Sequence, residues 1–233
     1  MSRSPLIYNP RAIPVVGTDA HLPAVPIERL HPAAVLARFA APPAWTPEFP
    51  GDNVRLDAAI DPRPASVLVP LVRHGDELRV LLTRRTDHLR NHAGQISFPG
   101  GRVDPGDVDA VGTALREAQE EVGLAPQAVR IIGSLPSYTT VTSFVVTPVV
   151  GLIEAGQVLQ IDPFEVAEVF EVPLLFLMNP AHHQRHVFEE ASLRRQFLSM
   201  PWRGPGLTGE VSEHFIWGAT AAMLRNLYRF FSA

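Results

Sequence analysis

Three glutamates in one short segment are the clearest sign of chemistry in this sequence. Glu117, Glu120 and Glu121 stand at positions i, i+3 and i+4, so a helix places them on one face, within about 100° of one another. Like charges at this spacing destabilise a helix by roughly 0.2–0.5 kcal/mol, and the macrodipole disfavours negative charge in a last turn. The pattern therefore indicates a site for a cation such as Mg²⁺, which prefers oxygen ligands. The alternative is a solvated acidic face of an amphipathic helix.

A polar, glycine-rich segment, residues 84–107, precedes these glutamates and contains Phe98-Pro-Gly-Gly101. A loop of this length within a domain is usually functional. Glycines leading into a helix bring backbone N–H groups close to an anion. Carboxylates for a metal, together with a loop suited to phosphate, indicate hydrolysis of a phosphoanhydride, in which the metal neutralises the diphosphate and activates water.

The helix that carries the glutamates is predicted over residues 108–122. Its apolar positions, spaced 3, 4, 3 and 4, are Val108, Val111, Leu115, Ala118 and Val122. Asp107 is expected to cap its N-terminus and Gly123 its C-terminus.

The rest of the chain predicts an α/β protein with an extension at its N-terminus. Residues 1–64 hold 12 of the 23 prolines and are expected to form an extension, with an irregular arm over 1–30, one short helix at 31–39 and a loop over 41–52. Residues 65–233 are expected to form the catalytic domain. Its predicted strands are residues 67–73, 78–83, 128–134 and 144–153, its predicted helices 174–177 and 216–231, and its predicted irregular region 178–212.

Composition narrows the possible functions. The 233 residues are 46% apolar, enough for an ordinary core, and the net charge of −4 argues against a general nucleic-acid binder. The chain has no cysteine and no lysine, which excludes thiolate chemistry, lysine Schiff bases and a Walker-type phosphate loop. No apolar run approaches the roughly 20 residues needed to cross a bilayer, so we expect a cytoplasmic protein with no membrane partner.

The segment from Gly101 to Leu124 resembles the signature of the Nudix hydrolases, G-x5-E-x7-R-E-U-x-E-E-x-G-U. It departs from the pattern in two places: Asp107 replaces the first glutamate, with eight residues before Arg116 instead of seven, and Ala118 is smaller than the pattern asks. The resemblance implies the Nudix α/β/α sandwich, with a mixed sheet and a loop-helix-loop catalytic motif. It also implies that Glu117, Glu120 and Glu121 bind Mg²⁺ or Mn²⁺ and that Arg116 orients them.

A second motif resembles the coenzyme A pyrophosphatase branch of that family. It comprises Leu81–Thr86, Arg90, Gly94 and Phe98–Gly101, and it matches L-L-T-x-R-S-x3-R-x3-G-x3-F-P-G-G with Thr86 in place of serine. The resemblance implies hydrolysis of coenzyme A, or of an acyl form, to 4′-phosphopantetheine and adenosine 3′,5′-bisphosphate. Arg85, Arg90, Gly100 and Gly101 are the expected substrate-binding residues.

Five arginines within 24 residues suit a substrate with phosphates at two places: Arg79, Arg84, Arg85, Arg90 and Arg102. A solvated arginine-rich loop is the alternative explanation. ADP-ribose or a dinucleotide remains an alternative substrate, and a non-catalytic nucleotide sensor is an alternative function. A homodimer is expected from the family.

Several other residues are weaker candidates. By the resemblance, Glu165 is a candidate general base, although an exposed strand edge explains it equally well, and Glu168 and Glu171 are weaker still. His182 and His183 are expected to face solvent, with binding of a metal or a phosphate as the alternative. His92 is a candidate for substrate contact, and the hydroxyls of residues 137–140 are expected in a cap or turn.

Overall fold

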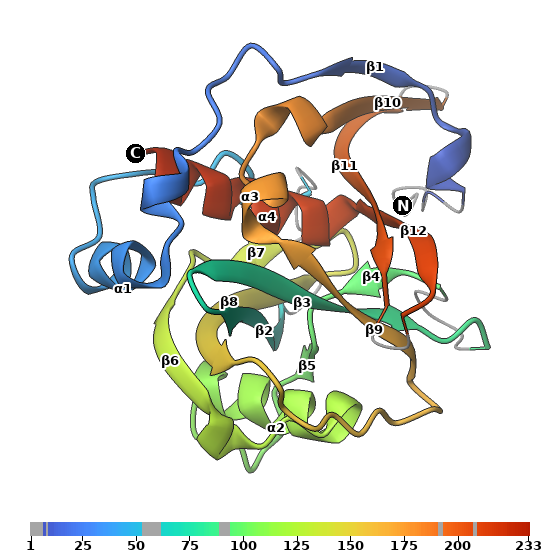
Figure 1. Ribbon diagram of the computed structural model, residues 1–233. Coiled ribbons are helices and arrows are strands. Elements are labelled where there is room, and N and C mark those ends of the chain that lie inside the picture. The colour runs from blue at the N-terminus through green and yellow to red at the C-terminus, as the bar shows by residue number, and fades with distance from the viewer. Residues whose placement is uncertain (1–6, 8, 53–61, 89–93, 191–192, 207–208) are drawn as a thin grey trace.

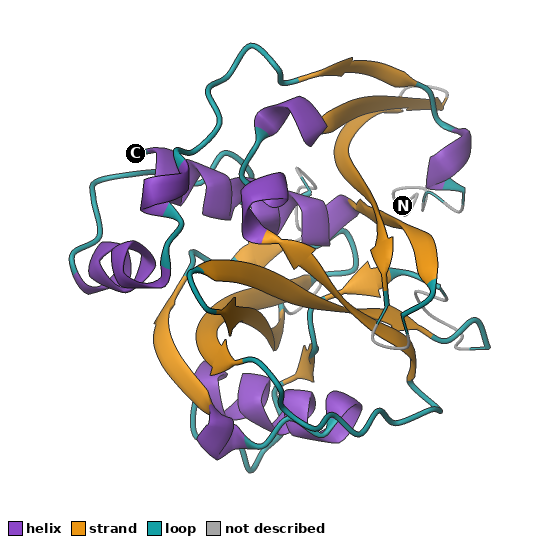
Figure 2. Cartoon of the chain, viewed as in Figure 1, coloured by secondary structure: helices purple, strands orange, loops and turns teal. Residues whose placement is uncertain are grey.

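The computed structural model describes residues 7, 9–52, 62–88, 94–190, 193–206 and 209–233. A mixed sheet forms the middle of the molecule, with one helix under it and a second sheet and helix above it (Figures 1 and 2). This is the expected α/β arrangement. None of the described helices is long and apolar enough to cross a membrane.

The central sheet is mixed and has eight strands. Its main order is β4-β3-β2-β8-β6, with β5 beside β2, β7 beside β8 and β9 beside β3; β2 and β8 run parallel, and every other pair is antiparallel. The strands are β2 (Arg63–His74), β3 (Glu77–Arg85), β4 (Ile96–Ser97), β5 (Gly100–Arg102), β6 (Val129–Ser134), β7 (Tyr138–Thr139), β8 (Phe144–Glu154) and β9 (Val166–Pro173). The predicted strands over residues 67–73 and 78–83 are confirmed as parts of β2 and β3, which pair as a hairpin.

A second sheet corrects two expectations from the sequence. Its order is β1 (Val15–Thr18), β10 (Gln184–Glu190), β11 (Leu193–Pro205) and β12 (Val211–Trp217), all antiparallel. The prediction of an irregular region over 178–212 was therefore wrong, and the arm over residues 1–30 contributes a strand. Pro201 and Pro205 lie in the part of β11 that pairs with β12 alone, past the residues that pair with β10, and proline is tolerated where one side of a strand makes no ladder bonds.

The helices agree closely with prediction. They are α1 (Pro32–Ala40), α2 (Ala110–Val122), α3 (Leu174–Leu177) and α4 (Gly218–Ser232), with short 3₁₀ turns η1 (Pro10–Ala12), η2 (Ile27–Arg29), η3 (Pro126–Ala128) and η4 (Pro180–His182). Helix α4 starts two residues later than expected, because β12 continues through Trp217.

The start of α2 is a further correction. Asp109, not Asp107, is the N-cap: its Oδ1 accepts a hydrogen bond from the N–H of Gly112 at 2.8 Å. Val108 lies outside the helix and is 95% exposed. Gly123 ends the helix in the left-handed conformation, φ 69°, as expected.

Packing fixes α2 against one face of the central sheet. Ala114, Ala118 and Val122 are fully buried and contact Leu68 and Val149 of the sheet. The opposite face is covered by α4 and the second sheet in a larger core, which also includes Val25, Leu30 and Val35 of the N-terminal segment. This packing also places α2 beside β5.

Candidate active site

Glu121 is the most buried of the three helix glutamates, at 4% exposed. Its Oε2 accepts a hydrogen bond from the N–H of Gly100 at 3.2 Å, and its Oε1 accepts a longer one from Nη1 of Arg85 at 3.4 Å. Burial raises the pKa of Glu121 to about 8, even though these two partners favour the charged form. In the absence of a cation, the Glu121 carboxyl is therefore mainly protonated at neutral pH.

Glu117 lies beside it, next to Gly101 of β5. A Cβ added at Gly101 would lie 2.5 Å from the Glu117 carboxyl group, so a glycine at this position makes room for that group. Burial raises the pKa of Glu117, while the adjacent Arg116 opposes the rise. The site thus holds two carboxyl groups that desolvation makes reluctant to ionise.

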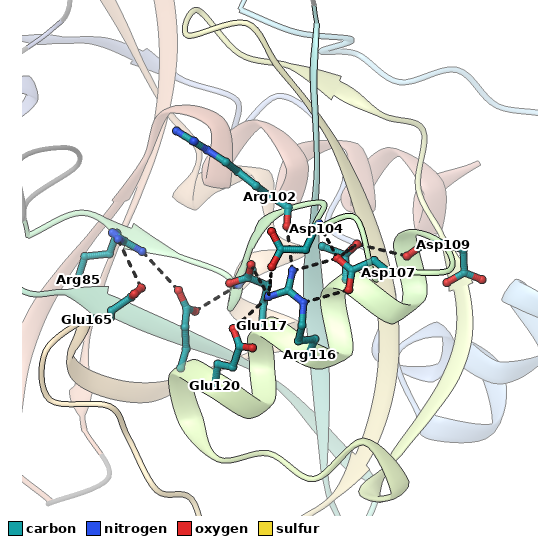
Figure 3. A network of polar contacts seen from close by, with 12 residues as sticks. Arg85, Arg102, Asp104, Asp107, Asp109, Arg116, Glu117, Glu120 and Glu165 are labelled. Carbon is teal, nitrogen blue, oxygen red and sulfur yellow. Dashed lines mark hydrogen bonds and ion pairs between the residues drawn. The ribbon is translucent and has the colours of Figure 1, made fainter.

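Arg116 is the centre of the polar network (Figure 3). Its Nη1 donates to both Glu117 Oε1 and Glu120 Oε2 at 3.0 Å, and its Nη2 donates to the carbonyl of Arg102 at 2.9 Å. The guanidinium therefore joins two helix carboxylates to β5, and its role in orienting them for catalysis remains a prediction.

Asp107 secures Arg116 from the other side. Its two oxygens accept from Nε and Nη2 of Arg116, both at 3.0 Å, in a bidentate pair. Asp107 is itself held by the N–H of Asp104 at 2.8 Å and the hydroxyl of Thr113 at 2.9 Å. The hydrogen bonds from Arg116 hold the pKa of Asp107 well below its usual range. The sequence did not show this role, because Asp107 was expected to cap the helix.

Glu165 reaches the same cluster from the segment before β9. Its Oε2 lies 3.8 Å from Nη2 of Arg85, and its charge helps to raise the pKa values of Glu117 and Glu121. Its role as a general base remains a prediction. Glu168 and Glu171 lie elsewhere on β9: Glu168 forms an ion pair with Arg84 at 3.2 Å, and a carboxylate oxygen of Glu171 lies 2.7 Å from Nε2 of His74.

The structure describes Arg85, Gly100 and Gly101, three of the four residues expected to bind substrate. Arg85 lies between Glu121 and Glu165, and the Gly100 N–H is engaged by Glu121. Arg90 and His92 lie outside the described residues. Of the other arginines, Arg79 pairs with Glu77 at 3.0 Å, and Arg84 pairs with Glu168.

The histidine pair is a correction. His183 is fully buried: its Nε2 lies 2.8 Å from the carbonyl of Leu177, and its Nδ1 lies 2.9 Å from Nη1 of Arg225. Burial lowers the pKa of His183 to about 4, so the ring is neutral, with the proton on Nε2. His182 is partly buried and stacks on Phe176 at 4.0 Å, so neither ring is a solvent-facing one.

The hydroxyl-rich segment stabilises local structure. Thr140 Oγ1 accepts from the N–H of Phe144 at 3.0 Å, which confirms a turn. The hydroxyl of Tyr138 is buried and donates to Asp52 at 2.6 Å.

The carboxylate cluster has the chemistry of a divalent-cation site. Every candidate ligand is a hard oxygen, and the mutual repulsion of Glu117, Glu121 and Glu165 is the kind that a bound cation relieves. Within the described part of the chain, no three acidic or histidine side chains already converge on one point. The glutamates are instead spread around Arg116 and Gly100, so the donor set fits a metal while its present geometry is that of an ion-pair network.

Comparison with known proteins finds a family profile and relatives that match most of this chain. A family profile described as "NUDIX domain" matches residues 62–197. A protein of Salmonella paratyphi B named "Uncharacterized Nudix hydrolase NudL" is 44% identical over 169 residues, covering 72% of this chain and 82% of that protein. The same name and identity are found for the protein of Salmonella newport.

Solved structures with a similar arrangement include a MutT/nudix family protein from Enterococcus faecalis. It is 20% identical with a TM-score of 0.44, and the match covers 76% of this chain and 64% of that one. An Ap4A hydrolase from C. elegans is 20% identical with a TM-score of 0.41, covering 47% of this chain and 80% of that one.

The chain belongs to the Nudix hydrolase family. It is an enzyme of the class that hydrolyses nucleoside diphosphate derivatives, and Nudix hydrolases generally require divalent metal ions such as Mg²⁺ or Mn²⁺.

Proposed function

We propose that this enzyme hydrolyses the diphosphate of coenzyme A, or of an acyl form, with Mg²⁺ or Mn²⁺. The observation that carries the proposal is the position of Arg85. This arginine belongs to the motif that resembles the coenzyme A branch, and its guanidinium lies within 3.8 Å of both Glu121 and Glu165. A guanidinium at the carboxylate cluster suits the diphosphate that a metal there would also bind.

Each residue has a role in this reaction. Glu117, Glu120 and Glu121 would hold the metal, which when bound supplies charge neutralisation of the diphosphate and activation of water. Arg116, fixed by Asp107, orients Glu117 and Glu120.

The bond changes follow from the substrate. Glu165 accepts a proton from the attacking water, whose oxygen bonds to one phosphorus while the bridging P–O bond of the diphosphate breaks. The products are 4′-phosphopantetheine and adenosine 3′,5′-bisphosphate. Arg85 faces the diphosphate and offsets the charge of the carboxylates around it.

The test is to incubate the purified protein with coenzyme A and Mg²⁺ or Mn²⁺ and to resolve the products by mass. Glu121→Gln should lower kcat by at least about 100-fold, the typical loss when one preorganised electrostatic group is removed. Glu154→Gln, which removes an exposed carboxylate outside the cluster, is the matched control and should leave kcat unchanged.

An ADP-ribose arm separates the alternatives. Cleavage of ADP-ribose with coenzyme A left intact would contradict the proposed substrate and keep the Nudix chemistry. Binding of either nucleotide with no cleavage would instead support a sensor, although the chain retains all three box glutamates.

A further inference from the structure

Two arginine side chains lie close to one phenylalanine ring, at the end of the central sheet where β2 and β8 begin. Arg63 begins β2 and is paired with Phe144 of β8, and Arg102 ends β5 opposite Ala65. The guanidinium carbons lie 4.2 Å (Arg63) and 5.3 Å (Arg102) from the centroid of the Phe144 ring. Both distances are within the range of cation–π attraction.

All three side chains lie on the sheet face that points away from α2. Paired residues on adjacent strands share a face, and residue 65 belongs to the core opposite α2, whereas the hydroxyl of Ser66 bonds to Ala110 of α2. Arg102 therefore makes contacts on both sides of the sheet. Its carbonyl accepts from Arg116, and its side chain points away from the carboxylate cluster (Figure 3).

No carboxylate among the residues that the structure describes neutralises this pair. Within the described ranges, neither Arg63 nor Arg102 has a carboxylate within ion-pair distance, in contrast to Arg79, Arg84 and Arg85. Both side chains are exposed. Two neighbouring cations repel each other, and the arrangement becomes favourable when a multiply charged anion lies between them.

The turn before β8 holds Arg63 in place. Ser143 adopts a left-handed conformation, φ 64°, which is uncommon for a residue with a side chain. Its carbonyl accepts from the N–H of Arg63 at 2.9 Å, and the Arg63 guanidinium donates to the carbonyl of Thr142. Backbone strain of this kind is often retained at functional sites.

We propose that Arg63 and Arg102, held over Phe144, bind a phosphomonoester group of the substrate, separate from the diphosphate at the carboxylate cluster. The proposal rests on the proposed function, in which that group is the 3′-phosphate of coenzyme A. A guanidinium pair is well suited to a phosphate dianion because each fork donates two parallel hydrogen bonds.

The experiment compares coenzyme A with dephospho-coenzyme A, which lacks the 3′-phosphate. Arg63→Ala and Arg102→Ala should each raise KM for coenzyme A about tenfold, the effect of losing one charge-assisted hydrogen bond. Their kcat values, and their KM values for dephospho-coenzyme A, should stay at the wild-type level. Arg130→Ala removes another exposed arginine, on β6 at the far edge of the sheet, and is the matched control. An unchanged KM in both variants, or equal rises for both substrates, would overturn the proposal.

A binding measurement tests the arginine pair even if coenzyme A is not the substrate of the enzyme. If the wild-type enzyme leaves coenzyme A intact, the proposed function fails, and calorimetry with adenosine 3′,5′-bisphosphate and with AMP still tests the arginine pair. The wild type should prefer the bisphosphate, and the Arg63→Ala, Arg102→Ala double variant should lose that preference. Equal affinity of the wild type for both nucleotides, or binding of inorganic phosphate as tight as that of the bisphosphate, would refute a substrate subsite.

Discussion

Glu121 couples the stability of the metal-free enzyme to pH. Its pKa is about 8 in the folded protein, against an ordinary value of 4.5. Between these values the folded state binds a proton that the unfolded state releases, so the free energy of unfolding falls as pH rises through this window. The penalty is absent below about pH 4.5 and complete above about pH 8.

This predicts that Glu121→Gln stabilises the metal-free protein. The gain should stay below about 1 kcal/mol at pH 5 and reach a few kcal/mol at pH 9, at about 1.4 kcal/mol per pKa unit. Urea unfolding in the presence of a chelator, at both pH values, measures it. Glu154→Gln is the control, and the argument fails if the gain is equal at pH 5 and pH 9.

The sequence showed which glutamates share a face, because helical spacing alone determines this. It did not show that Glu121 is buried while Glu120 is exposed. That difference arises from the position of Gly100 on β5, which donates its N–H to Glu121 across a contact between residues 21 apart in sequence. The sequence likewise did not show that Asp107 forms a bidentate pair with Arg116.

The geometry of the site depends on the close approach of strand β5 to helix α2. Since a Cβ at Gly101 would lie 2.5 Å from the Glu117 carboxyl group, Gly101→Ala should push that group aside. The flexible end of Glu117 can move, so we expect little loss of stability. A misplacement of about 1 Å can lower the rate about 100-fold.

The matched control for this prediction is Gly106→Ala, where a Cβ would meet no atom within 4 Å. Steady-state kinetics and thermal unfolding of both variants provide the comparison. If Gly101→Ala retains wild-type kcat, close approach at this position is not required for catalysis.

Elements with regular periodicity were predictable, including α1, the β2–β3 hairpin, most of α2 and α4. The strands β10 and β11 were not, because β11 carries Pro201 and Pro205, which interrupt a strand pattern, although its partners β10 and β12 are its neighbours in sequence. The start of α2 was ambiguous because Asp107 and Asp109 both suit an N-cap. Asp107 is held by Arg116, and Asp109 is the residue that caps the helix by accepting from the N–H of Gly112.

At the scale of the whole molecule, a buried ionic cluster connects the N-terminal segment to α4 and the second sheet. Arg225 of α4 is fully buried and pairs with Asp19 at 3.2 Å and Glu48 at 2.7 Å. Glu48 also pairs with Arg185 of β10 and Arg229 of α4, at 3.0 and 2.7 Å. The proline-rich composition of residues 1–64 predicted an extension and gave no sign of this cluster, whose partners are more than 130 residues apart.

Glu48 should therefore contribute strongly to stability at neutral pH. Burial alone would raise its pKa, but hydrogen bonds from Arg225, Arg229 and Arg185 lower it to about 2. A depressed carboxyl pKa gives stability that is complete above the ordinary value of 4.5 and is lost as pH falls through about 2. Glu48→Gln should lower the free energy of unfolding by roughly 2–4 kcal/mol at pH 7, because it leaves buried arginines without their shared anion.

The difference between wild type and Glu48→Gln should shrink by more than half between pH 7 and pH 3, since the wild-type unfolded state then gains the proton that the folded state resists. Urea unfolding at both pH values measures it, with Glu28→Gln, an exposed glutamate of the same segment, as the control. A stability loss in Glu48→Gln that stays constant with pH would mean that the carboxylate charge is not what joins the N-terminal segment to the enzyme. A loss no larger than that of Glu28→Gln would mean that the segment is held by its apolar contacts, through Val25, Leu30 and Val35.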